Sequence, residues 1–177
     1  MEGVSKRIKF DAVLARFSPE YAYHFIGVSK KMADSFKFEK GSRRVVCTLN
    51  GTETFPCALM PHDGAFFLMV NKATRARLGV VAGDLVTVEI VKDESKYGMP
   101  MPEELQEVLD QDAEGDRLFH ALTPGKQRSM LYFIGKIKDI DRRIHTALIF
   151  LEHLKRNDGK IDHARLTEDL KRPMFHL

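Results

Sequence analysis

Histidine and cysteine are the side chains best suited to bind a metal or attack a substrate, yet here their spacing forms no known motif. Cys57 and His62 could pair a thiol with an imidazole, but Cys57 falls on a predicted core face, where a thiol is inert. His145 and His153 lie two helical turns apart, too far to share an ion. GxSxG, HExxH and CxxC are absent. We therefore predict a protein that is not an enzyme and that carries no metal or cofactor.

The glycine-containing stretch GVVAGD (79–84) invites comparison with a phosphate-binding loop. A Walker loop follows a strand and ends in Lys-Ser/Thr before a helix. Here the predicted order is helix, turn, strand, and Asp84 would repel an anion. We predict instead that the first glycine ends a short helix over 73–78. The two valines of the loop then enter the core, and the chain turns into a strand over 85–91.

The remaining candidates for a functional role are basic: Arg43, Arg44, Lys72, Arg75 and Arg77, with Arg142 and Arg143 at the start of a long predicted helix. Basic side chains bind nucleic-acid phosphates, so the first five are candidate nucleic-acid contacts. The last two are candidate interaction residues. No aromatic residues interleave with them as a base-stacking platform requires, and we expect most of these side chains on solvated surface.

Composition limits the class of protein that holds these residues. Of 177 residues, 44% are hydrophobic and 30% are charged, and the net charge is +3, a balance typical of a globular protein. No apolar run approaches the roughly 20 residues that cross a bilayer. The charges scattered through the first residues are unlike a signal peptide. We predict a cytoplasmic protein with no membrane span.

Two halves of the chain differ in their pattern. Residues 1–97 read as a mainly β domain, with strands over 8–14 and 21–28. Residues 98–177 read as a helical domain. The stretch KDESKYGMPMP (92–102) between them combines charge with glycine and prolines, which predicts an extended linker.

Residues 43–70 contain three strand-like runs separated by Asn50-Gly51 and Asp63-Gly64. Both dipeptides tolerate the positive φ angles of hairpin turns, so we predict a three-stranded meander. Pro56 cannot donate a ladder hydrogen bond, and we expect it at a bulge or on an unpaired edge.

Both faces of this predicted meander are apolar. One face carries Phe55, Cys57, Leu59, Phe66, Leu68 and Val70, and the other carries Ala58, Met60, Phe67 and Met69. A sheet with one face in water would alternate apolar with polar residues. We therefore expect helices or another subunit to cover the second face.

Whether the two cysteines lie close together depends on the register of the first hairpin. A two-residue turn would place Cys47 and Cys57 on opposite faces, whereas a three-residue loop would set them opposite each other. Intracellular disulfides are rare, so we expect reduced, buried thiols.

The second half shows helix signals. PEELQEVLDQD begins with proline and acids, Thr123-Pro124 and Asp139 are expected caps, and Asp158-Gly159 is an expected stop. Apolar stripes follow these caps, namely Met130, Ile134 and Ile137, and then Ile140, Ile144, Ala147, Leu148, Leu151 and Leu154. These stripes need a surface to bury against, and the outer face of the meander is the expected one.

The pattern K-A-x-R-x-x-L-G-V-x-x-G-D-x-V-x-V at 72–88, with the preceding LNGTETFPCALMPHDGAFFLMV, resembles a bacterial β-barrel family of unknown function. That fold is similar to the double-split barrel of the AbrB and MazE transcription regulators. LTPGKQRSMLYFIGKIKDIDRRIHTALIFLEHL (122–154) resembles the helical domain called YdeI or OmpD-associated, or bacteriocin protection. Such families usually have threonine and arginine before Arg-Arg-Ile, where this chain has Asp-Ile-Asp at 139–141.

The resemblance implies an architecture, a small closed or double-split β-barrel followed by helices, but no established activity. Our main hypothesis is a non-enzymatic binding or interaction module with an unknown protein partner or with itself. One alternative is an AbrB-like DNA-binding regulator that uses the basic barrel surface. Another is a ligand-binding protein or enzyme with a pocket between barrel and helices.

Overall fold

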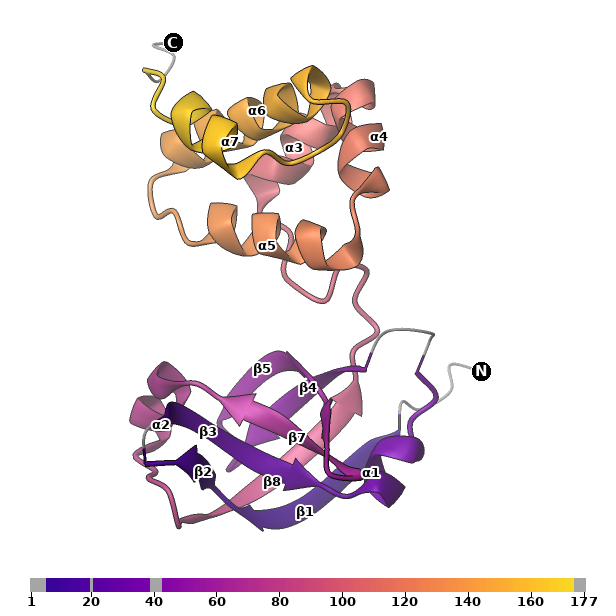
Figure 1. Cartoon of the computed structure of the whole chain (residues 1–177), viewed down its shortest axis with the longest axis vertical. Helices are drawn as coiled ribbons and strands as arrows, with labels where there is room; N and C mark the ends of the chain where they lie inside the picture. Colours follow the sequence, from indigo (N-terminus) through magenta and orange to yellow (C-terminus); the bar gives the residue numbers. More distant parts are fainter. Residues whose placement is uncertain (1–5, 20, 39–42, 174–177) are drawn as a thin grey trace. The chain divides into compact units, whose positions relative to one another are not determined.

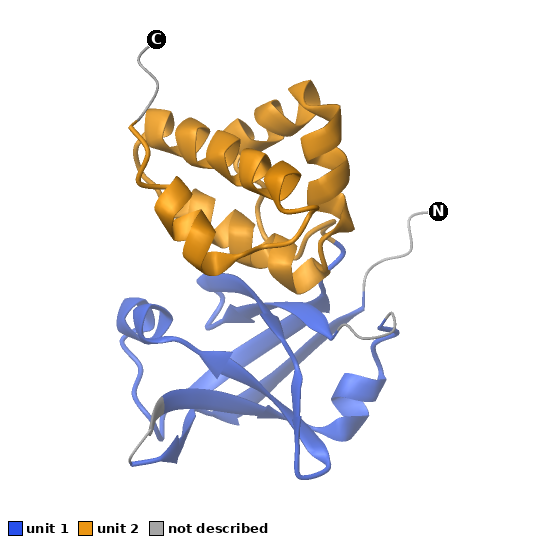
Figure 2. Cartoon of the chain, turned by 45° about the horizontal axis from the view of Figure 1, so that its top comes forward, with its two compact units in different colours: residues 1–94 blue, residues 95–177 orange. Residues whose placement is uncertain are grey.

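The computed structural model describes residues 6–19, 21–38 and 43–173. The chain forms two compact units, residues 1–94 and residues 95–177, shown in blue and orange in Figure 2. Each unit has a hydrophobic core of its own, and each is described by itself.

The first unit consists of two four-stranded antiparallel sheets and two short helices (Figure 1). The first sheet has the order β1-β8-β4-β5, with β1 (Arg7–Val13), β8 (Leu85–Lys92), β4 (Arg44–Leu49) and β5 (Glu53–Ala58). The second has the order β2-β3-β7-β6, with β2 (Ala15–Ser18), β3 (Tyr21–Val28), β7 (Ala65–Val70) and β6 (Met60–His62). The predicted β region is confirmed, but among the described strands no ladder joins the two sheets into a closed barrel.

The core of this unit contains the inward side chains of both sheets. Its fully buried members include Ile26, Leu68, Val45, Val88 and Ile90. They come from β3, β7, β4 and β8, where buried residues alternate with more exposed ones. This period of two is what a sheet with one face on a core requires.

The predicted three-stranded meander is wrong, because the chain changes sheets at Leu59. The β4–β5 hairpin belongs to the first sheet and the β6–β7 hairpin to the second. Leu59 lies at the corner between them. Its side chain is buried in the core, and its N–H donates to the Arg43 carbonyl over 2.9 Å. Pro56 lies on the edge strand β5, as expected.

The six residues predicted to share the inner face all contact or form the core, so the facing was right although the sheet is split. The other face is covered in part by its own neighbours. Phe17 from β2 stacks on Phe25 from β3 with 4.2 Å between ring centroids, and both rings meet Phe67 edge-on. These rings half-bury Phe67, and Met69, which pairs with Phe25 across the β3–β7 ladder, is half-buried as well.

The β4–β5 register settles the geometry of the cysteines. Leu49 pairs with Glu53, so the loop has three residues. Cys47 then lies opposite Phe55, and Cys57 lies opposite Val45. The two thiols share one face as diagonal neighbours, rather than facing each other directly. Both are free, and burial raises the pKa of Cys57 to about 12 and that of Cys47 well above its usual range.

Helix α1 (Lys30–Asp34) is capped by Ser29. Helix α2 (Lys72–Leu78) ends at Gly79, which has a left-handed φ of 66°. After α2 the Asp84 carboxylate accepts the Val81 N–H over 2.8 Å, so it occupies a donor that a phosphate would need. The predicted helix–turn–strand order is confirmed. The expectation for the two valines holds only for Val80, because Val81 is 66% exposed on the turn.

The second unit is helical, with α3 (Glu103–Gln111), α4 (Ala113–Ala121), α5 (Pro124–Gly135), α6 (Ile140–Arg156) and α7 (His163–Asp169). Thr123 and Asp139 cap α5 and α6 as predicted. Helix α6 is central and contacts each of the other four helices. No helix in the described part of the chain is long and apolar enough to cross a membrane.

The predicted linker is partly wrong. Residues 93–102 have no regular secondary structure, but Tyr97, Met99 and Met101 pack on the helical core. The prediction that the helical stripes need the meander is also wrong. Ala147, Leu151 and Leu154 are buried in the helical unit itself.

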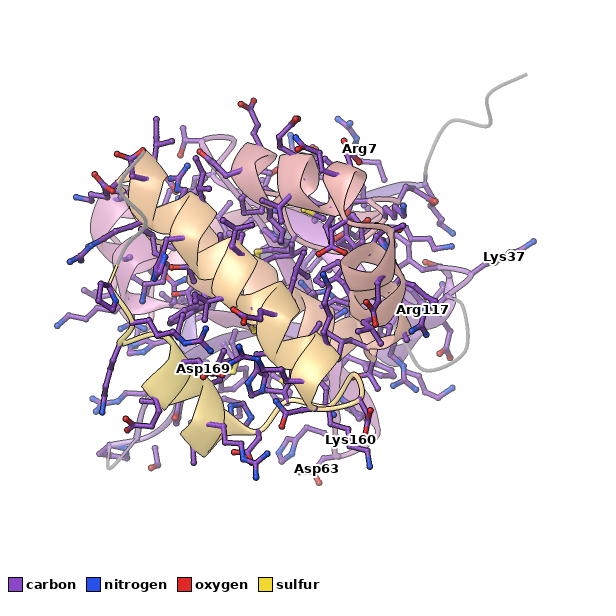
Figure 3. All side chains as sticks on the ribbon, turned by 90° about the horizontal axis from the view of Figure 1, so that it is seen from above. Arg7, Lys37, Asp63, Arg117, Lys160 and Asp169 are labelled. Carbon is purple, nitrogen blue, oxygen red and sulfur yellow. The ribbon has the colours of Figure 1, made fainter. Side chains whose placement is uncertain are left out.

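His153 joins α6 to the last helix. It is fully buried, and its Nδ1 lies 3.1 Å from the Asp169 carboxylate, while its Nε2 accepts the Asp162 N–H over 3.1 Å. Asp169 is labelled on α7 in Figure 3. Both ring nitrogens of His153 therefore have polar partners within the unit. Its role is structural.

Candidate functional site

The helical unit carries a surface groove of about 720 Å³ whose two walls are α3 and α6. These helices pack side by side (Figure 1). The α3 side is acidic, and the α6 side is apolar. We call this feature the α3–α6 groove.

An apolar row forms the α6 side of the groove. It consists of Ile140, Ile144 and Leu148, which recur every four residues and so follow one edge of the helix. They are 61%, 36% and 39% exposed, although the neighbouring positions Ala147 and Leu151 are buried. Single exposed apolar residues are common on proteins. Three in register beside a groove indicate a contact surface.

An acidic rim forms the α3 side, consisting of Glu103, Glu104, Glu107 and Asp112. Arg143 contacts Glu104 at 3.3 Å, and Lys155 contacts Asp112 at 2.5 Å. Among the described residues, Glu103 and Glu107 form no ion pair. They lie one helical turn apart on the groove, and no lysine or arginine is among the described residues that line it.

Asp112 is held in place by both a helix cap and an ion pair. Its side chain caps α4 by accepting the Gly115 N–H over 2.9 Å. The hydrogen bond from Lys155 holds the pKa of Asp112 below its ordinary value, and the cap N–H adds to this effect. This end of the groove is therefore fixed to α6. Among the described residues Glu103 and Glu107 have no such ion pair, although Glu107 accepts a hydrogen bond from Gln111 Nε2 over 2.7 Å.

Replacing Asp112 by Asn is expected to flatten the acid side of the stability curve. The folded pKa of Asp112 is lowered. Its ion pair therefore contributes stability above the unfolded value near about 3.9, and this is lost as the pH falls through the folded pKa. Asn keeps the helix cap and removes the charge. Urea unfolding from about pH 5 to pH 3 should show a smaller loss for the variant, by about 1 kcal/mol or less for a half-exposed pair. Equal losses would contradict the assignment.

The basic residues predicted as nucleic-acid contacts lie in the first unit, but the structure separates them into two groups. Arg43 and Arg44 are at the start of β4, and the Arg43 guanidinium lies 5.2 Å from the centre of the Phe66 ring. Arg44 lies opposite Ala58 in the β4–β5 ladder, at one end of the hairpin. Arg77 forms an ion pair with Glu53 at the other end, five residues or about 16 Å away along β5.

Two arginines of the second group are engaged within the unit. Arg75 Nη1 donates to the Val70 carbonyl and lies 2.7 Å from His24 Nδ1. Arg77 donates to the Glu53 carboxylate over 2.8 Å. Lys72 is exposed at the first residue of α2. Because part of this charge is used internally and the groups are apart, the five residues do not form one continuous basic surface.

The two predicted interaction residues on α6 differ. Arg142 is exposed. Arg143 donates through Nε to the Ile137 carbonyl and through Nη1 to Glu104, so it links α6 to α3 and positions the acidic rim. Arg143 thus supports the groove, rather than reaching out of it.

Sequence reasoning missed the groove itself. In the sequence, the acids of α3 indicate only the start of a helix, and the apolar row belongs to a stripe that is expected to be buried. Their exposure depends on which neighbours α6 has, which no local pattern contains. Within the described part of the chain, His, Cys, Asp and Glu do not gather in groups of three that could hold a metal ion.

Comparison with known families agrees with these two units. Residues 10–90 match a family described as a domain of unknown function, DUF1905. Residues 99–157 match a family described as bacteriocin-protection, YdeI or OmpD-associated. The chain carries a DUF1905 domain followed by a YdeI/OmpD-associated domain. No curated protein matches it. The α3–α6 groove lies within the YdeI/OmpD-associated match, so it is a feature of that domain in this chain.

Proposed function

We propose that the chain is a non-enzymatic binding protein whose YdeI/OmpD-associated domain holds a segment of another polypeptide in the α3–α6 groove. The observation that carries this proposal is the apolar row of Ile140, Ile144 and Leu148, left exposed beside an acidic helix. Burying such a row on a partner is favourable, at about 25 cal/mol for each Å² of apolar surface.

The family description supports a binding role. Its words include bacteriocin protection and OmpD-associated, and association implies contact with another polypeptide. The rim carboxylates lie along an open groove rather than in a dry pocket, which favours binding over acid–base catalysis. For the DUF1905 domain we propose a double-split barrel fold, supported by its two packed antiparallel sheets.

The two alternatives have less support. DNA binding would need a continuous basic surface, and the five candidate residues lie in separated groups. An enzyme or ligand-binding protein with a pocket between barrel and helices stays a hypothesis from the sequence.

A display library of random peptides selected on the full chain tests the proposal. The counter-selection uses an Ile144→Ala/Leu148→Ala variant, which shortens the apolar row without adding charge to the groove. Both side chains are more than a third exposed and alanine is a good helix former, so the variant should stay folded, which circular dichroism can check. We expect peptides that bind the wild-type chain at least about tenfold more tightly than the variant. A library that yields only peptides bound equally by both chains would refute the groove as a binding site.

A further inference from the structure

We propose that the partner segment in the α3–α6 groove is a basic amphipathic helix. This inference rests on the proposed function and specifies its partner class. Three features of the groove support it: the negative charge of the α3 wall, the spacing of the apolar residues on the α6 wall, and the fact that both walls are helices.

Charge selects a basic partner. Glu103 and Glu107 form no ion pair within the described part of the chain. The two cations near the rim, Arg143 and Lys155, are already paired with Glu104 and Asp112. No lysine or arginine is among the described residues that line the groove. An acidic segment would meet uncompensated negative charge there, whereas a basic one would find two carboxylates one turn apart.

The spacing of the apolar row selects a helix. Ile140, Ile144 and Leu148 form a ridge that repeats every four residues over eight residues, about 12 Å. The four-residue ridge of one helix packs into the corresponding groove of another. A partner helix with apolar residues at i and i+4 therefore fits this ridge, as in other helix-in-groove complexes.

Both walls also disfavour an extended partner. An added strand needs an unpaired sheet edge that offers backbone N–H and C=O groups. Here each wall is a helix whose backbone is hydrogen-bonded internally. What the groove offers is side chains alone, apolar on α6 and anionic on α3.

The combined geometry defines the partner's pattern. Leucine-like residues at i and i+4 would cover Ile144 and Leu148, and lysine or arginine on the flank toward α3 would meet Glu103 and Glu107. Two to three helical turns, about 8–11 residues, are enough to span the row.

Two synthetic peptides test this inference on the full chain. Both have the same helical leucine pattern. One has lysine along the flank, and its twin has glutamate at those positions. Each is labelled, and its binding is measured by fluorescence anisotropy at low and high salt. We expect the lysine peptide to bind at least about tenfold more tightly than its twin, with a difference that shrinks as salt screens the charges.

Charge variants locate the effect. Glu103→Lys/Glu107→Lys should weaken binding of the lysine peptide at least about tenfold and should improve binding of the glutamate twin. Glu103→Gln/Glu107→Gln should weaken binding of the lysine peptide less than the reversal does. This neutral variant keeps the proposal testable if the reversal variant fails to fold. The matched control, Glu114→Lys/Glu168→Lys, changes the net charge equally at exposed positions that do not line the groove. It should leave the affinity within about twofold.

The outcomes separate this inference from the proposed function. Equal binding of the two peptides, or an equal effect of the reversal and control variants, would overturn the basic partner. So would groove-dependent library peptides without enrichment in lysine and arginine, while the groove itself would remain a binding site. If no library peptide depended on Ile144 and Leu148, the proposed function would fail, and this inference with it.

Discussion

Replacing Phe150 by alanine should lower the free energy of unfolding of the helical unit by about 3–5 kcal/mol. Phe150 is fully buried on α6, and its ring meets Phe119 edge-on with 6.5 Å between centroids. Both rings belong to the same core, which α6 connects to every other helix of the unit. Alanine would leave a cavity at the centre of these contacts, and the surrounding helices could close it only in part.

The measurement is chemical denaturation followed by the helical circular dichroism signal. Phe150→Leu is the matched control, since it keeps most of the apolar volume and should cost clearly less. Loss of less than about 1 kcal/mol for alanine would contradict the central position of α6.

Replacing Leu59 by alanine should cost about 2–5 kcal/mol in the first unit. Leu59 is the residue at which the chain leaves the first sheet and enters the second, and its side chain is 2% exposed in the core that both sheets share. Its N–H donates to the Arg43 carbonyl, which fixes the backbone at this corner. The lost contacts are therefore with both sheets.

Native-state hydrogen exchange over residues 43–92 would report this change, since the region includes strands of both sheets. Leu59→Met keeps the volume and should cost less than about 1.5 kcal/mol. If alanine and methionine cost the same small amount, Leu59 would not be the corner that joins the sheets.

Much of the local structure could be predicted because it depends on a few neighbouring residues. Asp63-Gly64 forms the expected two-residue hairpin turn, with both residues at positive φ. Thr123 and Asp139 cap their helices through their own side chains. Gly79 ends α2 in the left-handed region. In each case the geometry is set within about four residues, which is the range over which sequence patterns act.

The candidate site could be predicted only in fragments. The sequence shows the acids of α3 as a helix-start signal and the apolar row of α6 as a stripe to be buried, but it does not show that the two line one groove. Glu104 and Arg143, which connect the two walls, are 39 residues apart in sequence. The five basic residues predicted as nucleic-acid contacts are grouped only by chain order. The β4–β5 register places Arg44 at one end of the hairpin and Glu53, the ion-pair partner of Arg77, at the other.

Sequence alone determined the Asp63-Gly64 turn, the caps of α5 and α6 and the end of α2. It also determined which side chains of the hairpins face the core, and that the chain changes from β to helical structure. Tertiary structure alone decided that the chain changes sheets at Leu59, that Cys47 and Cys57 are diagonal neighbours, and that Ile140, Ile144 and Leu148 stay exposed. Turns and caps are local hydrogen-bonding choices. Sheet order, register and the exposure of a helix edge depend instead on which distant segments compete for the same core.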